Sequence, residues 1–177
     1  MKSFQIREAR AGDAPALARL RYSFRAELKA AAEDHETFVD RCTEWMATRL
    51  VDGSWRCWVA ELGGGAGGVS PTIVGCVWVE LVEKLPTPNG DRETHAYVSS
   101  FSVAPEHRGG GLGSRLLRAV MDWCESQGVD SMFLWPSERS RPLYERNGFE
   151  VAVGMLEHTR IGVSVTRPPV VDTDLPD

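Results

Sequence analysis

The chain has 177 residues, of which 42% are hydrophobic and 25% are charged. These values are typical of one globular domain and exclude a disordered chain or a disulfide scaffold. The net charge of −5 argues against a nucleic-acid partner bound through phosphate neutralisation. No apolar segment approaches the ~20 residues that cross a bilayer, and the first residues lack the pattern of a signal peptide. We therefore expect a cytoplasmic protein with no membrane partner.

The N-terminal quarter predicts a short strand followed by two helices. Residues 4–9 alternate loosely between apolar and polar side chains, as a strand does. Asp13 can cap a following helix, in which apolar residues recur every three or four positions up to Leu28. A second apolar series over 35–50 indicates another helix, and Gly53 is placed to end it.

Three long strands are predicted in the middle of the chain. Residues 55–62 and 72–82 are rich in β-branched and aromatic side chains, and the glycine run 63–68 separates them. We interpret this pattern as a hairpin with a long loop. A P-loop is excluded because no helix start with Lys-Ser/Thr follows the glycines. Residues 95–103 form the third strand, which Pro105 closes.

The C-terminal part alternates helices and strands. An amphipathic helix is predicted over 112–127 and a buried strand over 129–135. A short helix over 141–146, for which Ser140 can serve as the cap, precedes strand-like residues 149–155. We expect a single domain over 4–165 and a disordered tail over 166–177, which is rich in proline and aspartate.

The segment 103–114 is the most informative for chemistry, because it joins a strand to a glycine-rich helix start. The first N–H groups of a helix lack intrahelical partners, and glycines allow close approach of an anion such as a diphosphate. Arg108 adds a cation. The alternative is that the glycines only shape the turn. A dinucleotide fold is a poor alternative, because the spacing differs from G-x-G-x-x-G and the preceding strands form hairpins.

Two motifs resemble those of the GNAT superfamily of acetyltransferases. Arg108-x-x-Gly111-x-Gly113, following Val103-x-Pro105, resembles its acetyl-CoA signature. The segment 137–149, with Ser137, Ser140, Tyr144 and Gly148-Phe149 at matching spacing, resembles its second motif. The resemblance covers about residues 4–155. It implies an α/β fold with a mixed, largely antiparallel sheet, splayed central strands and flanking helices.

The resemblance also implies acetyl-CoA as co-substrate and no metal. Pantetheine would lie beside the main chain near Phe101 and Val103, where two strands splay apart. Ser137 and Ser140 either reach the pantetheine or nucleotide, or serve only as loop and cap residues. The diphosphate would lie on the amides of Arg108, Gly109, Gly110, Gly111, Gly113 and Ser114.

The reaction implied by the resemblance is acetylation of a primary amine by direct attack on the thioester, in a ternary complex. Tyr144 matches the family's general acid, and a phenol with a pKa of about 10 can protonate a thiolate with a pKa of about 8.5. The alternative role for Tyr144 is packing beside Leu143.

The general base is left open. On the third strand the odd positions His95, Tyr97, Ser99, Phe101 and Val103 are expected to share one face. The family often has Glu or His where this chain has Tyr97 and Ser99. Four alternatives remain: His95, Glu80, a water relay through Tyr97 and Ser99, or no dedicated base. The absence of Glu or His at positions 97 and 99 also motivates a second hypothesis, a catalytically inactive acyl-CoA-binding regulatory domain.

The acceptor is not identified by the sequence. In this family the segments that border the acceptor pocket correspond to those carrying Trp45 and Trp55 and acids such as Glu33. Arg25, Lys29 and Arg41 lie in the same helices and are expected to balance these acids. A small-molecule amine and a protein amine both remain candidates. Family members often dimerise, so a homodimer is a further expectation.

Overall fold

The structure, a computed structural model, describes residues 4–63, 71–89, 92–152 and 155. It divides into a larger unit, Met1–Leu134, and a smaller unit, Trp135–Asp177. The larger unit contains, in chain order, β1 (Phe4–Glu8), η1 (Ala11–Asp13), α1 (Ala14–Leu28), α2 (His35–Asp52), β2 (Arg56–Leu62), β3 (Thr72–Glu83), β4 (Thr94–Val103), η2 (Pro105–His107), α3 (Leu112–Ser126) and β5 (Ser131–Phe133).

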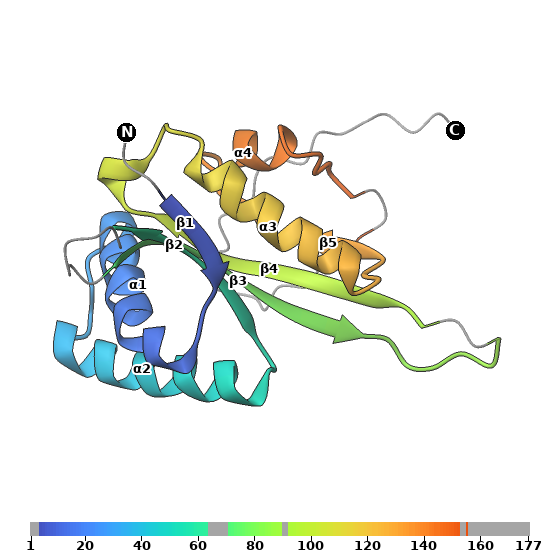
Figure 1. Cartoon of the computed structure of the whole chain (residues 1–177), viewed down its shortest axis with the longest axis horizontal. Coiled ribbons are helices and arrows are strands. Elements are labelled where there is room, and N and C mark those ends of the chain that lie inside the picture. Colours follow the sequence, from blue (N-terminus) through green and yellow to red (C-terminus); the bar gives the residue numbers. More distant parts are fainter. Residues whose placement is uncertain (1–3, 64–70, 90–91, 153–154, 156–177) are drawn as a thin grey trace. The chain divides into compact units, whose positions relative to one another are not determined.

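The strands form one sheet in the order β1-β2-β3-β4-β5 (Figure 1). The first four strands pair antiparallel, and β5 pairs parallel with β4. The expectation of a mixed, largely antiparallel sheet is thus confirmed. The last strand is shorter than predicted, since only Ser131–Phe133 of the predicted 129–135 are in β5.

Helices cover both faces of the sheet (Figure 1). Leu116 and Val120 of α3 pack with Val79 and Val98 on one face, which we call the α3 face. Leu17 of α1 and other buried side chains of α1 and α2 pack with Trp78 and Cys76 on the opposite face, the α1/α2 face. The sequence therefore builds two apolar layers, one on each side of a sheet whose central strands are buried.

The C-terminal end of α2 follows the predicted signal, whereas the start of α1 does not. The Asp34 carboxylate accepts from the Thr37 N–H at 3.0 Å, and Gly53 at φ +73° ends α2. Asp13 precedes α1 without a side-chain capping bond. Its carboxylate instead accepts from the Arg7 guanidinium, at 2.8 and 2.9 Å, and from the Arg10 N–H.

Arg7 joins β1, η1 and β2 through two carboxylates. Besides Asp13 it pairs with Glu61, which is buried. The hydrogen bonds from Arg7 lower the pKa of Asp13 and outweigh the effect of its burial. Arg7 thereby compensates two carboxylates beside the sheet, which would be costly to bury alone.

The smaller unit contains a short helix, α4 (Arg141–Glu145). The prediction of a strand over 149–155 is wrong for 149–152, which have no regular secondary structure. These residues follow Gly148, held at φ +90°, and find no strand partner within the described residues. The predicted tail 166–177 lies outside the described residues, as do residues 64–70 of the glycine-rich loop. No helix in the described part of the chain is long and apolar enough to span a membrane.

Candidate functional site

Strand β4 loses its partner on one side halfway along its length. It pairs with β5 only from His95↔Ser131 to Tyr97↔Phe133, whereas it pairs with β3 up to Val103. Beyond Tyr97 no strand among the described residues pairs with this edge. We call the side of Val98–Val103 that faces away from β3 and has no strand partner in the described chain the unpaired edge; its Val103 carbonyl accepts from the Arg108 Nε. This is the edge on which the sequence analysis placed Phe101 and Val103.

A β-bulge at Ser100 lies next to this unpaired edge. The register with β3 shifts between Cys76 and Trp78, and Ser100 has φ +49°. Among the described residues it is the only non-glycine residue with a positive φ. Arg21 of α1 donates to its Oγ at 2.7 Å. Such conformations are strained and persist where surrounding contacts hold them, often at functional sites.

The bulge corrects the prediction that the odd positions of β4 share one face. Tyr97 and Ser99 lie opposite Glu80 and Trp78, on the α1/α2 face. After the extra residue the alternation is reversed, so Phe101 and Val103 pack on the α3 face. The strict period of two used for the prediction cannot anticipate an inserted residue.

The loop after β4 holds Arg108 by both its main chain and its side chain. The Arg108 N–H donates to the Pro105 carbonyl at 3.2 Å, so this amide, predicted to bind diphosphate, is already engaged. Its Nε donates to the Val103 carbonyl at 2.7 Å, and its two Nη atoms donate to Glu27 of α1 at 2.9 and 3.0 Å. Arg108 therefore shapes the loop and ties it to α1, and Glu27 offsets its charge.

The next three residues, Gly109–Gly111, form what we call the glycine loop. Gly109 and Gly111 have φ +80° and +79°, which side-chain-bearing residues rarely adopt. A Cβ built on any of the three would have no neighbour within 4 Å. Their N–H groups donate to no other group in the described part of the chain. Successive free amides in such a conformation form a concave anion site.

Helix α3 starts directly after the glycine loop. The Arg115 N–H donates to the Gly111 carbonyl at 3.1 Å and closes the first turn. The N–H groups of Leu112, Gly113 and Ser114 precede that bond, at the positive end of the helix dipole. The space over the glycine loop, its amides and this helix start together suit a diphosphate. The residues present therefore fit the acetyl-CoA predicted from the sequence.

Three of the predicted catalytic residues lie together on the α1/α2 face. Glu80 is directly across from Tyr97 in the β3–β4 register, and Ser99 follows on the same face. The Tyr97 ring contacts Trp55, with centroids 5.8 Å apart, and stacks on Phe133 at 5.4 Å. These three residues therefore lie where β5 ends and the unpaired edge begins.

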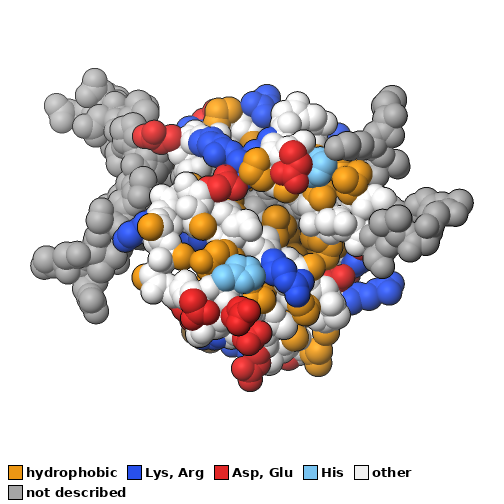
Figure 2. All heavy atoms as spheres, turned by 90° about the vertical axis from the view of Figure 1, so that its left-hand side faces the viewer, with side chains coloured by type: hydrophobic (Ala, Val, Ile, Leu, Met, Phe, Trp, Pro, Cys, Tyr) orange, Lys and Arg blue, Asp and Glu red, His pale blue; other side chains and the backbone are white. Residues whose placement is uncertain are grey.

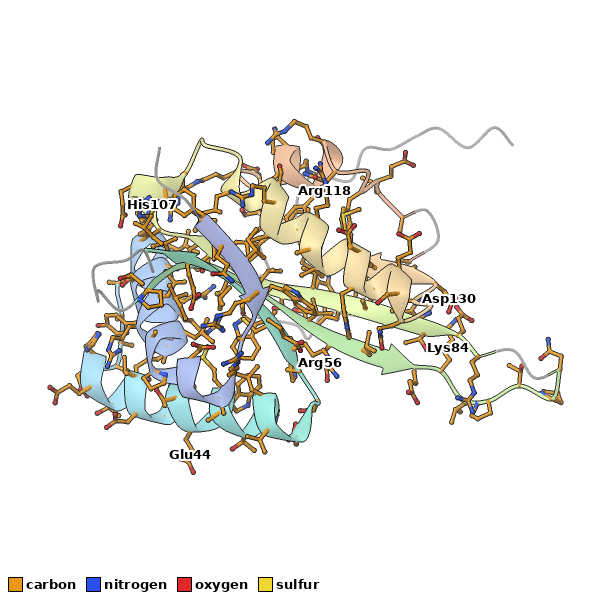
Figure 3. The ribbon with its side chains drawn as sticks, viewed as in Figure 1. Glu44, Arg56, Lys84, His107, Arg118 and Asp130 are labelled. Atoms are coloured by element: carbon orange, nitrogen blue, oxygen red, sulfur yellow. The ribbon has the colours of Figure 1, made fainter. Side chains whose placement is uncertain are left out.

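His95 is placed elsewhere, at the start of β4. Its Nδ1 lies 2.6 Å from the Ser131 Oγ, and its Nε2 lies 3.0 Å from the Glu93 carboxylate, which also pairs with Lys84. Figure 3 shows Lys84 and His107, a residue of η2, at opposite ends of the sheet. The His95 cluster is thus remote from the glycine loop, and its imidazole already has two partners.

The smaller unit carries the remaining predicted residues. Ser140 precedes α4 but makes no capping bond, because its Oγ instead accepts from the Ser137 N–H at 2.9 Å and donates to the Ser137 carbonyl at 3.0 Å. Tyr144 is 8% exposed, and its ring contacts Phe149 with centroids 5.7 Å apart. Burial raises the pKa of Tyr144 to about 12, so its phenol stays protonated across the physiological range.

Sequence reasoning missed three residues of the site: Arg21, Glu27 and Ser100. The first two lie on α1, far along the chain from their partners, Ser100 in β4 and Arg108 just before the glycine loop. Their spacing of six within one helix gives no signal of these contacts. No group of three or more His, Cys, Asp or Glu side chains in the described residues could hold a metal ion.

The chain is similar to known acetyltransferases. The family model "Acetyltransferase (GNAT) family" matches residues 17–149. A predicted acetyltransferase from Clostridium acetobutylicum, solved with acetyl-CoA, has a TM-score of 0.70 at 18% identity, covering 89% of this chain and 96% of that one. Glucosamine-6-phosphate N-acetyltransferase from Arabidopsis thaliana has a TM-score of 0.62 at 21% identity, covering 89% and 99%. The two structures show the fold, while the family match over most of the chain establishes that this protein belongs to the GNAT acetyltransferases.

Proposed function

We propose that this protein is an N-acetyltransferase that moves the acetyl group of acetyl-CoA to a primary amine. The observation that carries the proposal is the unpaired edge of β4 leading to the glycine loop and the start of α3. The edge suits the amides of pantetheine, and the loop suits its diphosphate. Bound acetyl-CoA would supply an activated thioester as acetyl donor.

The proposed reaction forms a bond between the amine nitrogen and the acetyl carbon and breaks the bond from that carbon to sulfur. The amine loses one proton and the departing thiolate gains one. Tyr144 is the proposed donor to the thiolate, and its raised pKa of about 12 keeps it protonated. This value also moves the ionisation of the phenol beyond the pH range of most assays.

For the proton lost by the amine, Glu80 is our preferred acceptor. It is the carboxylate paired across from Tyr97, beside the end of β5, whereas His95 is engaged at the far end of the strand. A water relay through Tyr97 and Ser99, which share the face of Glu80, would lead the proton to this carboxylate. Replacing Glu80 by Gln should lower the rate at neutral pH and less so at alkaline pH, where the amine is already deprotonated.

Two measurements test the function. Acetyl-CoA at 100 times its dissociation constant should stabilise the fold by about 2.7 kcal/mol, a rise in Tm of roughly 2–4 °C, and NAD should do much less. Release of free thiol in the presence of a panel of primary amines then measures transfer. Equal effects of acetyl-CoA and NAD would contradict the cofactor assignment. Binding without turnover on any amine would favour the inactive regulatory domain instead.

A further inference from the structure

A hollow of about 280 Å³ lies where α1 ends and α2 begins. Three cations line it: Arg21, Arg25 and Lys29. We call this feature the cationic hollow. The small side chains of 30–32, all alanine, also line it, as do the rings of Tyr22 and Phe38, whose centroids are 5.5 Å apart. Figure 2 faces the side of the molecule where α2 begins, and basic and acidic side chains lie on this face among exposed apolar atoms.

Arg21 and Arg25 lie on one face of α1, four residues apart, and Lys29 follows four residues later as the residue that caps the end of the helix. Like charges at this spacing repel and weaken a helix by a few tenths of a kcal/mol. Lys29, at the helix end, is favoured there by the helix dipole, but this reason does not extend to Arg21 in the middle of α1. The row therefore has a small cost to folding that a bound anion would remove.

The carboxylates near the cationic hollow are engaged with other cations. Both oxygens of Glu33, the acid in the lining, accept from Arg41, at 3.2 and 2.6 Å. Both oxygens of Glu27 accept from Arg108. The described residues form no ion pair with Arg25 or Lys29. Of the three cations expected to balance the acids of these helices, Arg41 is the one that pairs directly with Glu33.

Arg21 connects the cationic hollow to the bulge of β4. Arg21 lines the hollow, and its guanidinium donates to the Ser100 Oγ at 2.7 Å. Ser100 lies three residues after Tyr97, the last residue of β4 that pairs with β5. It is therefore in the part of β4 proposed to bind pantetheine. A molecule held in the hollow would thus lie beside the strand along which the acetyl donor is expected.

We infer that the cationic hollow binds an anionic group, a carboxylate or a phosphate, on the small amine that accepts the acetyl group. The inference rests on the proposed acetyl transfer and specifies its substrate class. Guanidinium groups present two parallel N–H donors that match carboxylate and phosphate oxygens. Arg25 and Lys29 supply the attraction, and Arg21 orients the anion relative to β4.

The test compares matched pairs of amines that differ in one charge. The amino acids are assayed against their amides, and phosphoethanolamine and glucosamine 6-phosphate against ethanolamine and glucosamine. The full-length protein is assayed with saturating acetyl-CoA, and free thiol is measured. We expect the anionic member of at least one pair to be acetylated with a kcat/KM at least about 10-fold higher than its partner, the size of one charge-assisted hydrogen bond. The carboxylate and phosphate arms show which anion is preferred.

Variants then locate the preference. R25Q and K29Q should each raise KM for the anionic amine about 5- to 10-fold and leave kcat and the neutral amine little changed. R19Q is the matched control, because Arg19 is exposed on the same helix and does not line the hollow. Acetyl-CoA affinity, measured by calorimetry, should be the same in all three variants and the wild type.

Several outcomes would overturn the inference without touching the proposed function. The first is a higher kcat/KM for the neutral member of each pair, and the second is acetylation of the neutral amines alone. The third is a preference for the anionic amine that is unchanged in R25Q and K29Q. Turnover of no anionic amine by a protein that binds acetyl-CoA would also refute it. Failure of the wild-type protein to bind acetyl-CoA would instead refute the proposed function on which the inference depends.

Discussion

Substitution of Gly110 separates the role of the glycine loop in ligand binding from its role in folding. Gly109 and Gly111 have positive φ angles, so any side chain there costs about 1–2 kcal/mol of folding free energy. Gly110 does not have a positive φ, and a Cβ on it would have no neighbour within 4 Å. The fold alone therefore gives no reason for glycine at 110, and alanine there should be neutral or slightly stabilising.

G110D should weaken acetyl-CoA binding in a folded protein. A carboxylate about 5 Å from one diphosphate charge is repelled by about 3 kcal/mol at an effective dielectric constant of 20. The loop is exposed, so screening reduces the net effect to about 1–2 kcal/mol, or about 5- to 30-fold in affinity. Calorimetric titration with acetyl-CoA measures the affinity, and thermal unfolding without ligand confirms the fold.

Two variants control for general effects of charge and bulk. G12D adds the same charge at another exposed glycine with open space around its Cβ and no positive φ, and it should bind acetyl-CoA as the wild type does. G110A adds bulk without charge and should show a smaller loss than G110D. Wild-type affinity in a folded G110D protein would refute the placement of the diphosphate over this loop. The glycines would then serve only the turn.

Three other substitutions test the catalytic and structural assignments. Y144F should lower turnover about 10²- to 10⁴-fold with acetyl-CoA affinity unchanged. The pKa of Tyr144 is about 12 in the folded protein and 10.0 in the unfolded chain, so the wild type should lose stability as the pH rises from about 10 to 12. Urea unfolding should show no such loss in Y144F. R7M leaves Glu61 and Asp13 uncompensated and should destabilise the fold by about 3–5 kcal/mol. Arg7 lowers the pKa of Asp13 in the folded protein, so the stability from the Arg7–Asp13 pair is present above the unfolded pKa of Asp13 and is lost as the wild type is acidified below about pH 4. G75A places a Cβ 3.1 Å from the Leu116 Cδ1 and should cost about 1–3 kcal/mol in thermal unfolding, whereas unchanged stability would show that α3 can shift on the sheet.

The elements that were predicted well are those whose signals are local. The β-branched segments gave β2 and β3, the spacing of Leu112, Leu116 and Val120 gave α3, and Gly53 marked the end of α2. In each case a run of neighbouring residues carries the periodicity or the turn conformation. The glycine turn that leads into α3 was also predictable, because its backbone freedom is a local property of the glycines, and its binding of a diphosphate stays a prediction.

Features that depend on distant partners were not predictable. The bulge at Ser100 reverses the faces of Phe101 and Val103, and its sign in the sequence is only a pair of serines inside a strand. Arg108 was predicted to act through a free amide and an uncompensated charge. Its amide closes a turn and its charge is offset by Glu27 of α1, contacts that follow from how α1 packs on the sheet.

Helix α1 contacts both halves of the proposed reaction. Arg21 holds the bulge of β4, and Glu27 holds Arg108 at the base of the glycine loop. Arg25 of the same helix and Lys29, which caps its end, line the cationic hollow. A shift of α1 would therefore move the side chains proposed to bind the anion together with the contacts that hold the proposed acetyl-donor site. One of these contacts fixes α1 to β4 and the other fixes it to the loop after β4. If the proposed sites are correct, the fold sets the distance between donor and acceptor, and orientation of the two substrates is the main contribution of the scaffold to the rate.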